Sequence, residues 1–186
     1  MPPDTKQSDL GRRLLFLLPV LAFLGLVGVF TLGLGHDPAA LPSAMIDKPA
    51  PAFALGPVMA DRPGLGRADL GGKPVLVNFF ASWCLPCKAE HATLAGLAAS
   101  GVPLYGIAYK DKPENAQRFL TDLGDPYRKI GLDLDGRTGI DFGVYGVPET
   151  YILDRDGRIR FRFAGALTDD VLKTEILPRL AALERP

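Results

Sequence analysis

Residues 75–90 (VLVNFFASWCLPCKAE) constrain the fold of this chain more than any other stretch, because they contain its only two cysteines, Cys84 and Cys87. The run at residues 75–80 is rich in β-branched and aromatic side chains, as buried parallel strands are. The Ala-, Leu- and Lys-containing residues that follow predict a helix, so Cys84 lies where a strand gives way to a helix N-terminus. Unpaired N–H groups and a partial positive charge at such an end favour a thiolate over a thiol. The stretch therefore predicts sulfur chemistry that begins at Cys84.

A pair of cysteines can also staple a fold or bind a metal. A disulfide that closes a four-residue loop stabilises a fold by about 2 kcal/mol, against about 5 kcal/mol for a 100-residue loop. Structural zinc normally takes four Cys or His ligands, and the chain adds only His36 and His91 to its two cysteines. We therefore favour a redox-active pair with no metal and no cofactor, and leave metal binding and a structural disulfide as alternatives. The C-x-x-C spacing near a βαβ unit is a thioredoxin-type signal, which Trp83 before the pair and Pro86 inside it strengthen.

Size and charge narrow the possible functions. The 186 residues, 47% of them hydrophobic, suffice for one membrane segment and one domain of about 140 residues. Lys plus Arg and Asp plus Glu both number 21, so no net charge attracts nucleic acid. Two cysteines are too few for a disulfide-stapled secreted fold. We expect a domain stabilised by its hydrophobic core, with no nucleic-acid partner.

An uncharged run of 22 residues, 14–35, predicts a transmembrane anchor. A helix of that length spans about 33 Å, enough for a hydrocarbon core of about 30 Å. A cleaved signal peptide is the alternative, but its apolar region is normally only about 7 to 15 residues long. Arg12 and Arg13 precede the run, so we expect residues 1–13 to form a cytoplasmic tail and the C-terminal domain to be exported. Four prolines within residues 36–52 predict an extended linker.

Residues 53–184 are predicted to form one α/β domain. The order strand, helix, strand around residues 75–109 predicts a right-handed parallel crossover. Charged and apolar side chains alternate through residues 158–163, as in an edge strand with one solvent-exposed face. The predicted strands are 53–58, 75–80, 102–109, 151–153 and 158–163, and the predicted helices are 86–99, 113–123, 137–142 and a C-terminal helix that starts at Thr168.

Glu90 is the acidic residue nearest to the cysteines in the predicted helix. It stands at i, with Leu94 at i+4 and Leu97 at i+7, so the three share a face and Glu90 is expected to point inward. It also follows Cys87 by three residues, close enough to influence the sulfur. An exposed glutamate in the first helical turn, favoured by the helix dipole, is the alternative.

Four motifs together resemble those of one family. They are WCLPC at 83–87, YKD at 109–111, GVYGVPET at 143–150 and the turn DRDG at 154–157. The chain resembles the membrane-anchored CcmG/DsbE proteins of cytochrome c maturation over residues 45–180. This resemblance implies a thioredoxin-like α/β fold, with a central mixed β-sheet flanked by helices and an N-terminal transmembrane helix. It also implies a single-pass protein of the bacterial inner membrane with its catalytic domain in the periplasm.

The same resemblance implies a function. Proteins of this family are thiol:disulfide oxidoreductases that reduce the haem-attachment cysteines of apocytochrome c, or a thiol protein of the maturation pathway. Their electrons come from a membrane thiol reductase of the CcdA or DsbD type. By this match Cys84 attacks and Cys87 resolves, and the two alternate between thiols and a redox-active disulfide.

The resemblance also assigns supporting residues. Pro148 matches the loop proline that is cis and lies beside the cysteines in thioredoxin-like folds. The sequence alone does not decide this isomer, since only about 5 to 6% of X-Pro bonds in folded proteins are cis. Glu90 and Glu149 match acidic positions around the active site. Asn78 stands where thioredoxin has a buried Asp, so the proton acceptor for Cys87 has to come from elsewhere. We expect the glutamates to supply it and their charges to oppose thiolate formation nearby.

Three other functions compete with this one. A peroxidase on this fold needs a Pro and a Thr or Ser ahead of its cysteine, where this chain has Val77 and Ala81. A copper-delivery protein could bind Cu(I) through the two cysteines and a histidine, but the sequence offers no histidine on a loop after the helix. A general periplasmic disulfide reductase or isomerase is the most serious alternative, because the sequence does not identify the partner.

Overall fold

The computed structural model describes residues 6–33 and 43–184, which fall into two compact units divided between residues 41 and 42. The first unit contains helix α1, Lys6–Gly33, which begins within the predicted tail. Most of the large apolar side chains described on it, from Phe16 to Leu32, are more than half exposed. None of the helices in the described part of the chain combines the length and the apolar character that crossing a membrane requires. Parts of three predicted segments lie outside the described residues: residues 1–5 of the tail, 34–35 of the anchor and 36–42 of the linker.

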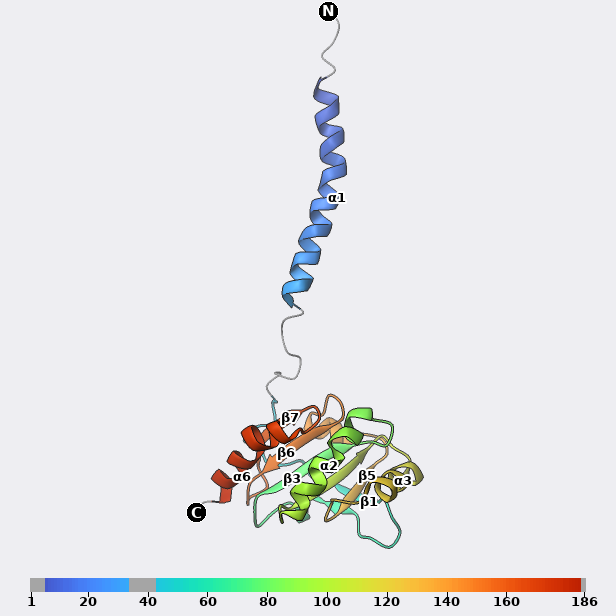
Figure 1. The fold of residues 1–186 in the computed structure, drawn as a ribbon, viewed down its shortest axis with the longest axis vertical. Helices are drawn as coiled ribbons and strands as arrows, with labels where there is room; N and C mark the ends of the chain where they lie inside the picture. The colour runs from blue at the N-terminus through green and yellow to red at the C-terminus, as the bar shows by residue number, and fades with distance from the viewer. Residues whose placement is uncertain (1–5, 34–42, 185–186) are drawn as a thin grey trace, which may run out of the picture. The chain divides into compact units, whose positions relative to one another are not determined.

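The second unit is built on a seven-stranded mixed sheet with the strand order β2-β1-β5-β4-β3-β6-β7 (Figure 1). β3 pairs in parallel with β4, and β4 with β5, whereas the other pairs are antiparallel. The predicted parallel crossover from β3 to β4 is therefore confirmed. The strands are β1 Ala54–Pro57, β2 Leu65–Gly66, β3 Val75–Phe80, β4 Leu104–Tyr109, β5 Ile130–Asp133, β6 Glu149–Leu153 and β7 Ile159–Ala164.

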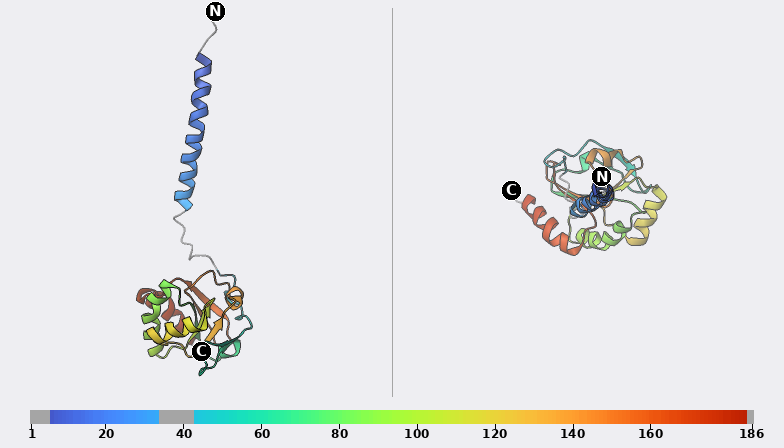
Figure 2. Two further views of the ribbon diagram at one scale, coloured as in Figure 1. Left: turned by 90° about the vertical axis from the view of Figure 1, so that its right-hand side faces the viewer. Right: turned by 90° about the horizontal axis from the view of Figure 1, so that it is seen from above.

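Most of the helices of this unit lie on one face of the sheet. Figure 2 shows α2, α3 and the C-terminal helices gathered on that side. The helices are α2 Leu85–Ala99, α3 Pro113–Leu123, α4 Arg137–Phe142, α5 Asp169–Val171 and α6 Leu177–Glu184, with a π-helical turn at Leu172–Ile176 and a 3₁₀ turn at Arg67–Asp69.

The central strand β3 divides the core into two clusters. All of its residues are buried, and successive side chains point to opposite faces. Leu76 and Phe80 pack with α2, α3 and the C-terminal helices, whereas Val77 and Phe79 pack on the other side. The carboxyl end of β3 leads directly into α2, so the turn between them carries Cys84 at the edge of a rigid core.

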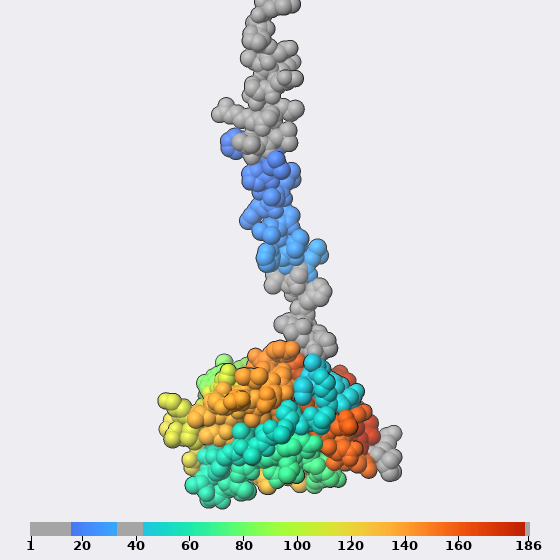
Figure 3. All heavy atoms as spheres, turned by 180° about the vertical axis from the view of Figure 1, so that it is seen from behind, coloured from blue at the N-terminus to red at the C-terminus, as the bar shows by residue number. Residues whose placement is uncertain are grey.

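The other face of the sheet is covered by α4 and by the chain that precedes β3. Ala50, Leu65 and Leu70 are buried there together with Phe142 of α4. In Figure 3 this part of the chain, cyan to blue-green, lies across the surface beside the orange segment. Residues 43–52 therefore pack on the domain, which begins before the predicted boundary at residue 53.

Two strands differ from the sequence-based expectation. β5 (Ile130–Asp133) was not predicted. It is only four residues long and lies between a Pro- and charge-rich segment and the next turn. β2 (Leu65–Gly66) lies in a Gly- and Pro-rich piece whose composition is typical of turns. Both segments form strands because they pair with neighbouring strands. Local composition does not reveal that pairing.

Candidate active site

Cys84 caps the N-terminus of α2 and is joined to Cys87 by a disulfide. The backbone N–H of Cys87 donates to Cys84 Sγ at 3.1 Å. The same donor, together with the helix dipole, would stabilise a thiolate on Cys84 after reduction. Cys84 is 4% exposed and Cys87 1%, so both cysteines are buried in the disulfide form. Cys84 is the one that lies at the helix N-terminus.

The loop that precedes β6 lies against the first sulfur. The carbonyl oxygen of Val147 is 3.4 Å from Cys84 Sγ, and the following peptide bond to Pro148 is cis. Pro148 itself is buried. The structure thus brings Pro148 and the cysteine pair together across more than sixty residues of sequence.

A buried carboxylate at the end of β4 holds the turn that carries Cys84. Asp111 accepts from the backbone N–H of Ser82 at 2.6 Å and from its hydroxyl at 2.9 Å. The indole N–H of Trp83 donates to the carbonyl of Lys110 at 3.2 Å. These bonds fix the two residues before Cys84. The rim around the pair is apolar and open, since Trp83 is 61% exposed and Pro86 is also exposed.

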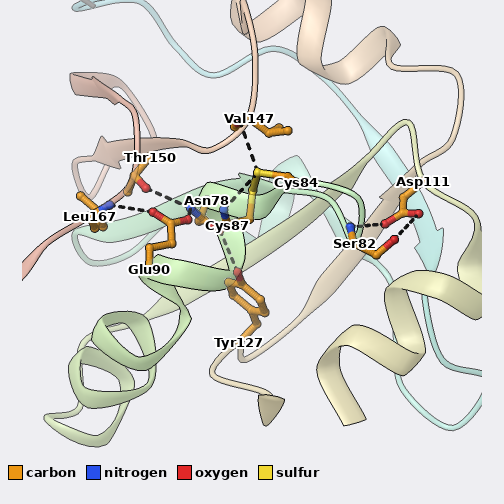
Figure 4. The surroundings of a disulfide bond; sticks show 10 residues. All are labelled: Asn78, Ser82, Cys84, Cys87, Glu90, Asp111, Tyr127, Val147, Thr150 and Leu167. Carbon is orange, nitrogen blue, oxygen red and sulfur yellow. Dashed lines mark hydrogen bonds between the residues drawn. A yellow bond between two sulfur atoms is a disulfide. The ribbon is translucent and has the colours of Figure 1, made fainter. Parts of the chain in front are cut away.

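Glu90 lies behind the cysteines in a buried polar network (Figure 4). Its Oε1 accepts from Asn78 Nδ2 at 2.9 Å, and its Oε2 accepts from the backbone N–H of Leu167 at 2.8 Å. Asn78 Nδ2 also donates to the hydroxyl of Thr150 at 3.0 Å, and Tyr127 donates to Asn78 Oδ1 at 2.7 Å. The inward orientation predicted for Glu90 is confirmed by its 1% exposure.

Within residues 6–33 and 43–184, no basic side chain forms a salt bridge with Glu90. Burial raises the pKa of Glu90 to about 7, although the donors Leu167 and Asn78 partly oppose that shift. Burial also raises the pKa of Tyr127, and the charge of Glu90 adds to that effect. A carboxyl group that titrates near neutral pH can accept and return a proton under physiological conditions.

Glu149 is also buried, but its surroundings are different. Arg162 donates to both carboxylate oxygens, with Nε to Oε2 at 2.7 Å and Nη2 to Oε1 at 2.8 Å. Tyr151 donates to Oε2 at 2.9 Å, and the backbone N–H groups of Tyr145 and Gly146 donate to Oε1 at 2.8 and 3.2 Å. The pairing raises the pKa of Arg162. Glu149 therefore ties the loop before Pro148 to the sheet, and Arg162 balances the charge that we expected to repel a thiolate.

Sequence reasoning missed Tyr127, Asp111 and Arg162. Asp111 belongs to a motif identified in the sequence, but no role was assigned to it. Arg162 was predicted to lie on the exposed face of an edge strand; Arg160 does so at 41% side-chain exposure, whereas the Arg162 side chain is only 5% exposed. Its partner Glu149 is 13 residues away in the sequence, so no local pattern indicates that Arg162 is buried.

His91, considered above as a metal ligand, makes its contacts with other parts of the fold. Its Nε2 lies 2.7 Å from the carbonyl of Gly124, and its ring packs edge-on against Phe119. Burial lowers the pKa of His91. Across the described residues, no group of three His, Cys, Asp or Glu side chains is arranged to hold a metal ion.

Comparison with known proteins identifies the family. The Redoxin family model matches residues 45–176. The chain is 46% identical to the thiol:disulfide interchange protein HelX of Rhodobacter capsulatus over 169 residues, covering 90% of this chain and 96% of HelX. It is 45% identical to the thiol:disulfide interchange protein DsbE of Pseudomonas aeruginosa over 168 residues, covering 90% of this chain and 93% of that protein.

A solved structure supports the same assignment. The secreted Mycobacterium tuberculosis disulfide oxidoreductase homologous to Escherichia coli DsbE superposes with a TM-score of 0.60 at 26% identity, covering 71% of this chain and 96% of that one. The thioredoxin-like α/β fold and the predicted resemblance are thereby confirmed. The chain belongs to the Redoxin family, among the DsbE-type thiol:disulfide interchange proteins, and is a thiol:disulfide oxidoreductase.

Proposed function

We propose that this protein is a reductant of protein disulfides in cytochrome c maturation, acting on apocytochrome c or on a thiol protein that serves it. The observation that carries the proposal is the arrangement of the cysteine pair. Cys84 is at the start of α2 beside the Val147 carbonyl. Glu90 is buried on α2 one helical turn after Cys87, and no described basic side chain forms a salt bridge with it. The relatives' shared name, thiol:disulfide interchange protein, supports the exchange chemistry.

The reaction follows from the order of the two sulfurs. The Cys84 thiolate attacks one sulfur of the partner disulfide, forms a mixed disulfide and expels the other partner sulfur as a thiolate. Cys87 then loses its proton and attacks Cys84 Sγ, which releases the second partner sulfur and leaves the Cys84–Cys87 disulfide. Two electrons pass from the cysteine pair to the partner, whose two thiolates take up protons.

Glu90 is the group that we assign to the proton of Cys87. The two residues are one helical turn apart on the same buried face of α2. A carboxyl with a pKa of about 7 can take the thiol proton directly or through one water molecule. Asn78 cannot serve in its place, since an amide does not titrate.

The proposed reducing task needs a supply of electrons. We infer a membrane thiol reductase of the CcdA or DsbD type as donor, because an exported domain meets an oxidising compartment. The proposal places the domain in the periplasm, anchored by residues 14–35. The uncharged sequence of that run and the exposed apolar side chains of α1 support an anchor. A reporter fused after Leu180 tests this topology, since cytoplasmic reporter activity would contradict it.

Trapping of mixed disulfides tests the proposed partner. Cys87→Ser keeps the attacking sulfur and removes the resolving one, so it should accumulate long-lived mixed disulfides with apocytochrome c or a maturation thiol protein. Cys84→Ser is the matched control and should trap almost none. Loss of either cysteine should lower the yield of c-type cytochromes, with partial rescue by added thiol. Normal cytochrome c levels in a strain that lacks both cysteines would favour a general periplasmic reductase instead.

A further inference from the structure

Tyr127 is a fully enclosed tyrosine that the exchange chemistry does not itself require. Its ring stacks on Phe80, with centroids 5.1 Å apart and planes at 14°. The ring also lies so close to β4 that a Cβ on Gly106 would be 2.9 Å from Tyr127 Cγ. Asp125 Oδ1 accepts from its backbone N–H, and Arg62 donates to its carbonyl, each at 2.9 Å. The ring and the backbone are therefore held from several sides.

The hydroxyl of Tyr127 has one acceptor, Asn78 Oδ1, at 2.7 Å. The amide of Asn78 has an oxygen at one end and an NH₂ group at the other, and its hydrogen bonds decide which end faces which partner. With Oδ1 occupied by Tyr127, the NH₂ group points to Glu90 Oε1 and to Thr150 Oγ1. A rotated amide would leave the Tyr127 hydroxyl hydrogen without an acceptor in the core, which is unfavourable.

The orientation of the amide affects the two forms of Glu90 differently. An NH₂ group donates to a carboxylate and stabilises the ionised form, whereas an amide oxygen accepts from a protonated carboxyl and stabilises the neutral form. Figure 4 shows Asn78 between Tyr127 and Glu90, so one side chain links the two. We propose that Tyr127 is a positioning residue, which by holding the Asn78 amide with its NH₂ group toward Glu90 favours the proton-accepting form of that carboxyl. This inference rests on the proposed role of Glu90 toward Cys87.

The surroundings of Glu90 leave few other groups that could set its titration. Among the described residues, Tyr127 is coupled to Glu90 through the charge of the carboxylate, and Cys87 gains a titratable thiol once the disulfide is reduced. The neighbouring His91 is bonded to Gly124 instead, and no described Lys, Arg or His forms a salt bridge with Glu90. The groups that face it come from five places: Asn78 on β3, Thr150 on β6, Tyr127 before β5, the Leu167 N–H after β7, and Cys87 on its own helix.

The variant Tyr127→Phe tests the inference, because it keeps the stacked ring and removes only the hydroxyl. The Asn78 amide can then rotate, so the pKa of Glu90 should rise by about one pH unit. The carboxyl titration of Glu90 is measured by carbon-13 NMR on the full oxidised chain, with Glu90→Gln to assign the signal. The matched control is Tyr151→Phe, a buried tyrosine that donates to Glu149 on the other face of the sheet. It should leave the Glu90 titration unchanged.

The same substitution made in an Asn78→Ala background distinguishes an effect on the Glu90 pKa through the amide from a direct effect of the Tyr127 hydroxyl. In Asn78→Ala the tyrosine has no amide to orient, so adding Tyr127→Phe should not move the Glu90 titration further. A Glu90 pKa unchanged by Tyr127→Phe in the native background would overturn the inference, as would an equal shift in both backgrounds. The Glu90 pKa could shift as expected while the pH dependence of the Cys87 attack on Cys84 stays unchanged. In that case the positioning role of Tyr127 stands and the proposed role of Glu90 fails.

Discussion

Glu90 and Glu149 are both almost completely buried, at 1% and 2% exposure, yet they lie on opposite faces of the sheet in opposite surroundings. Glu149 accepts bonds from Arg162, Tyr151 and two backbone N–H groups, so its charge is balanced and its position fixed. In the described part of the chain, the hydrogen-bond donors to Glu90 are Asn78 and Leu167, both neutral. A balanced carboxylate serves as an anchor, whereas one without a counter-ion can exchange a proton.

The strand register explains how two such sites can lie so close together. Asn78 pairs with Thr150 and Phe79 with Glu149 between β3 and β6, so neighbouring residues of β6 point to opposite faces. Thr150 joins the network of Glu90 on the α2 face, and Glu149 joins Arg162 on the other. Burial alone therefore does not decide the role of an acidic residue, because a counter-ion determines whether the buried carboxylate is held ionised or can exchange a proton.

Removing the counter-ion of Glu149 should have the largest effect on stability. Arg162→Leu leaves a buried carboxylate unpaired and should lower the free energy of unfolding by about 3 to 5 kcal/mol, measured by urea denaturation. The matched control is Arg160→Leu on the same strand, whose exposed pair with Asp47 is worth about 0 to 1 kcal/mol. Adding Glu149→Leu to Arg162→Leu should recover most of the loss. Equal, small losses in both single variants would show that Glu149 is not a charge-balanced anchor.

The pH dependence of stability should expose the unpaired state of Glu90. Its pKa is about 7 in the folded protein against 4.5 for an ordinary Glu, so the folded state binds more protons than the unfolded state between these values. The free energy of unfolding of the oxidised protein should therefore fall as pH rises from about 4.5 to 7, by about 3 kcal/mol. Asp133, whose pKa burial also raises, adds a slope of the same sign. The difference between the native chain and Glu90→Gln isolates the part due to Glu90, and a difference that does not vary with pH would contradict the assignment.

Much of this site follows from the sequence, and the rest depends on contacts that sequence does not show. The placement of Cys84 at a helix start and the inward orientation of Glu90 follow from local patterns, namely strand composition and helical periodicity. The hydroxyl of Tyr127 meets Asn78 across 49 positions, in a segment whose adjoining strand β5 was missed. Arg162 alternates like a solvent-facing residue of an edge strand, and its burial becomes clear only from its contacts with Glu149 of β6 and with the Tyr145 ring.

The kinetics of two successive thiol exchanges show whether Glu90, and not Glu149, takes the proton of Cys87. The reduced protein is mixed with excess aromatic disulfide, which releases one coloured thiolate when Cys84 attacks and a second when Cys87 closes the pair. In Glu90→Gln the second phase should slow by about 100-fold near pH 7 and lose its inflection, because a general base contributes at least that much, while the first phase serves as an internal control. Glu149→Gln should keep the inflection and alter mainly the first phase, through the loop that holds Val147 beside Cys84. A second phase in Glu90→Gln with the native rate and pH profile would show that Glu90 does not take the proton of Cys87.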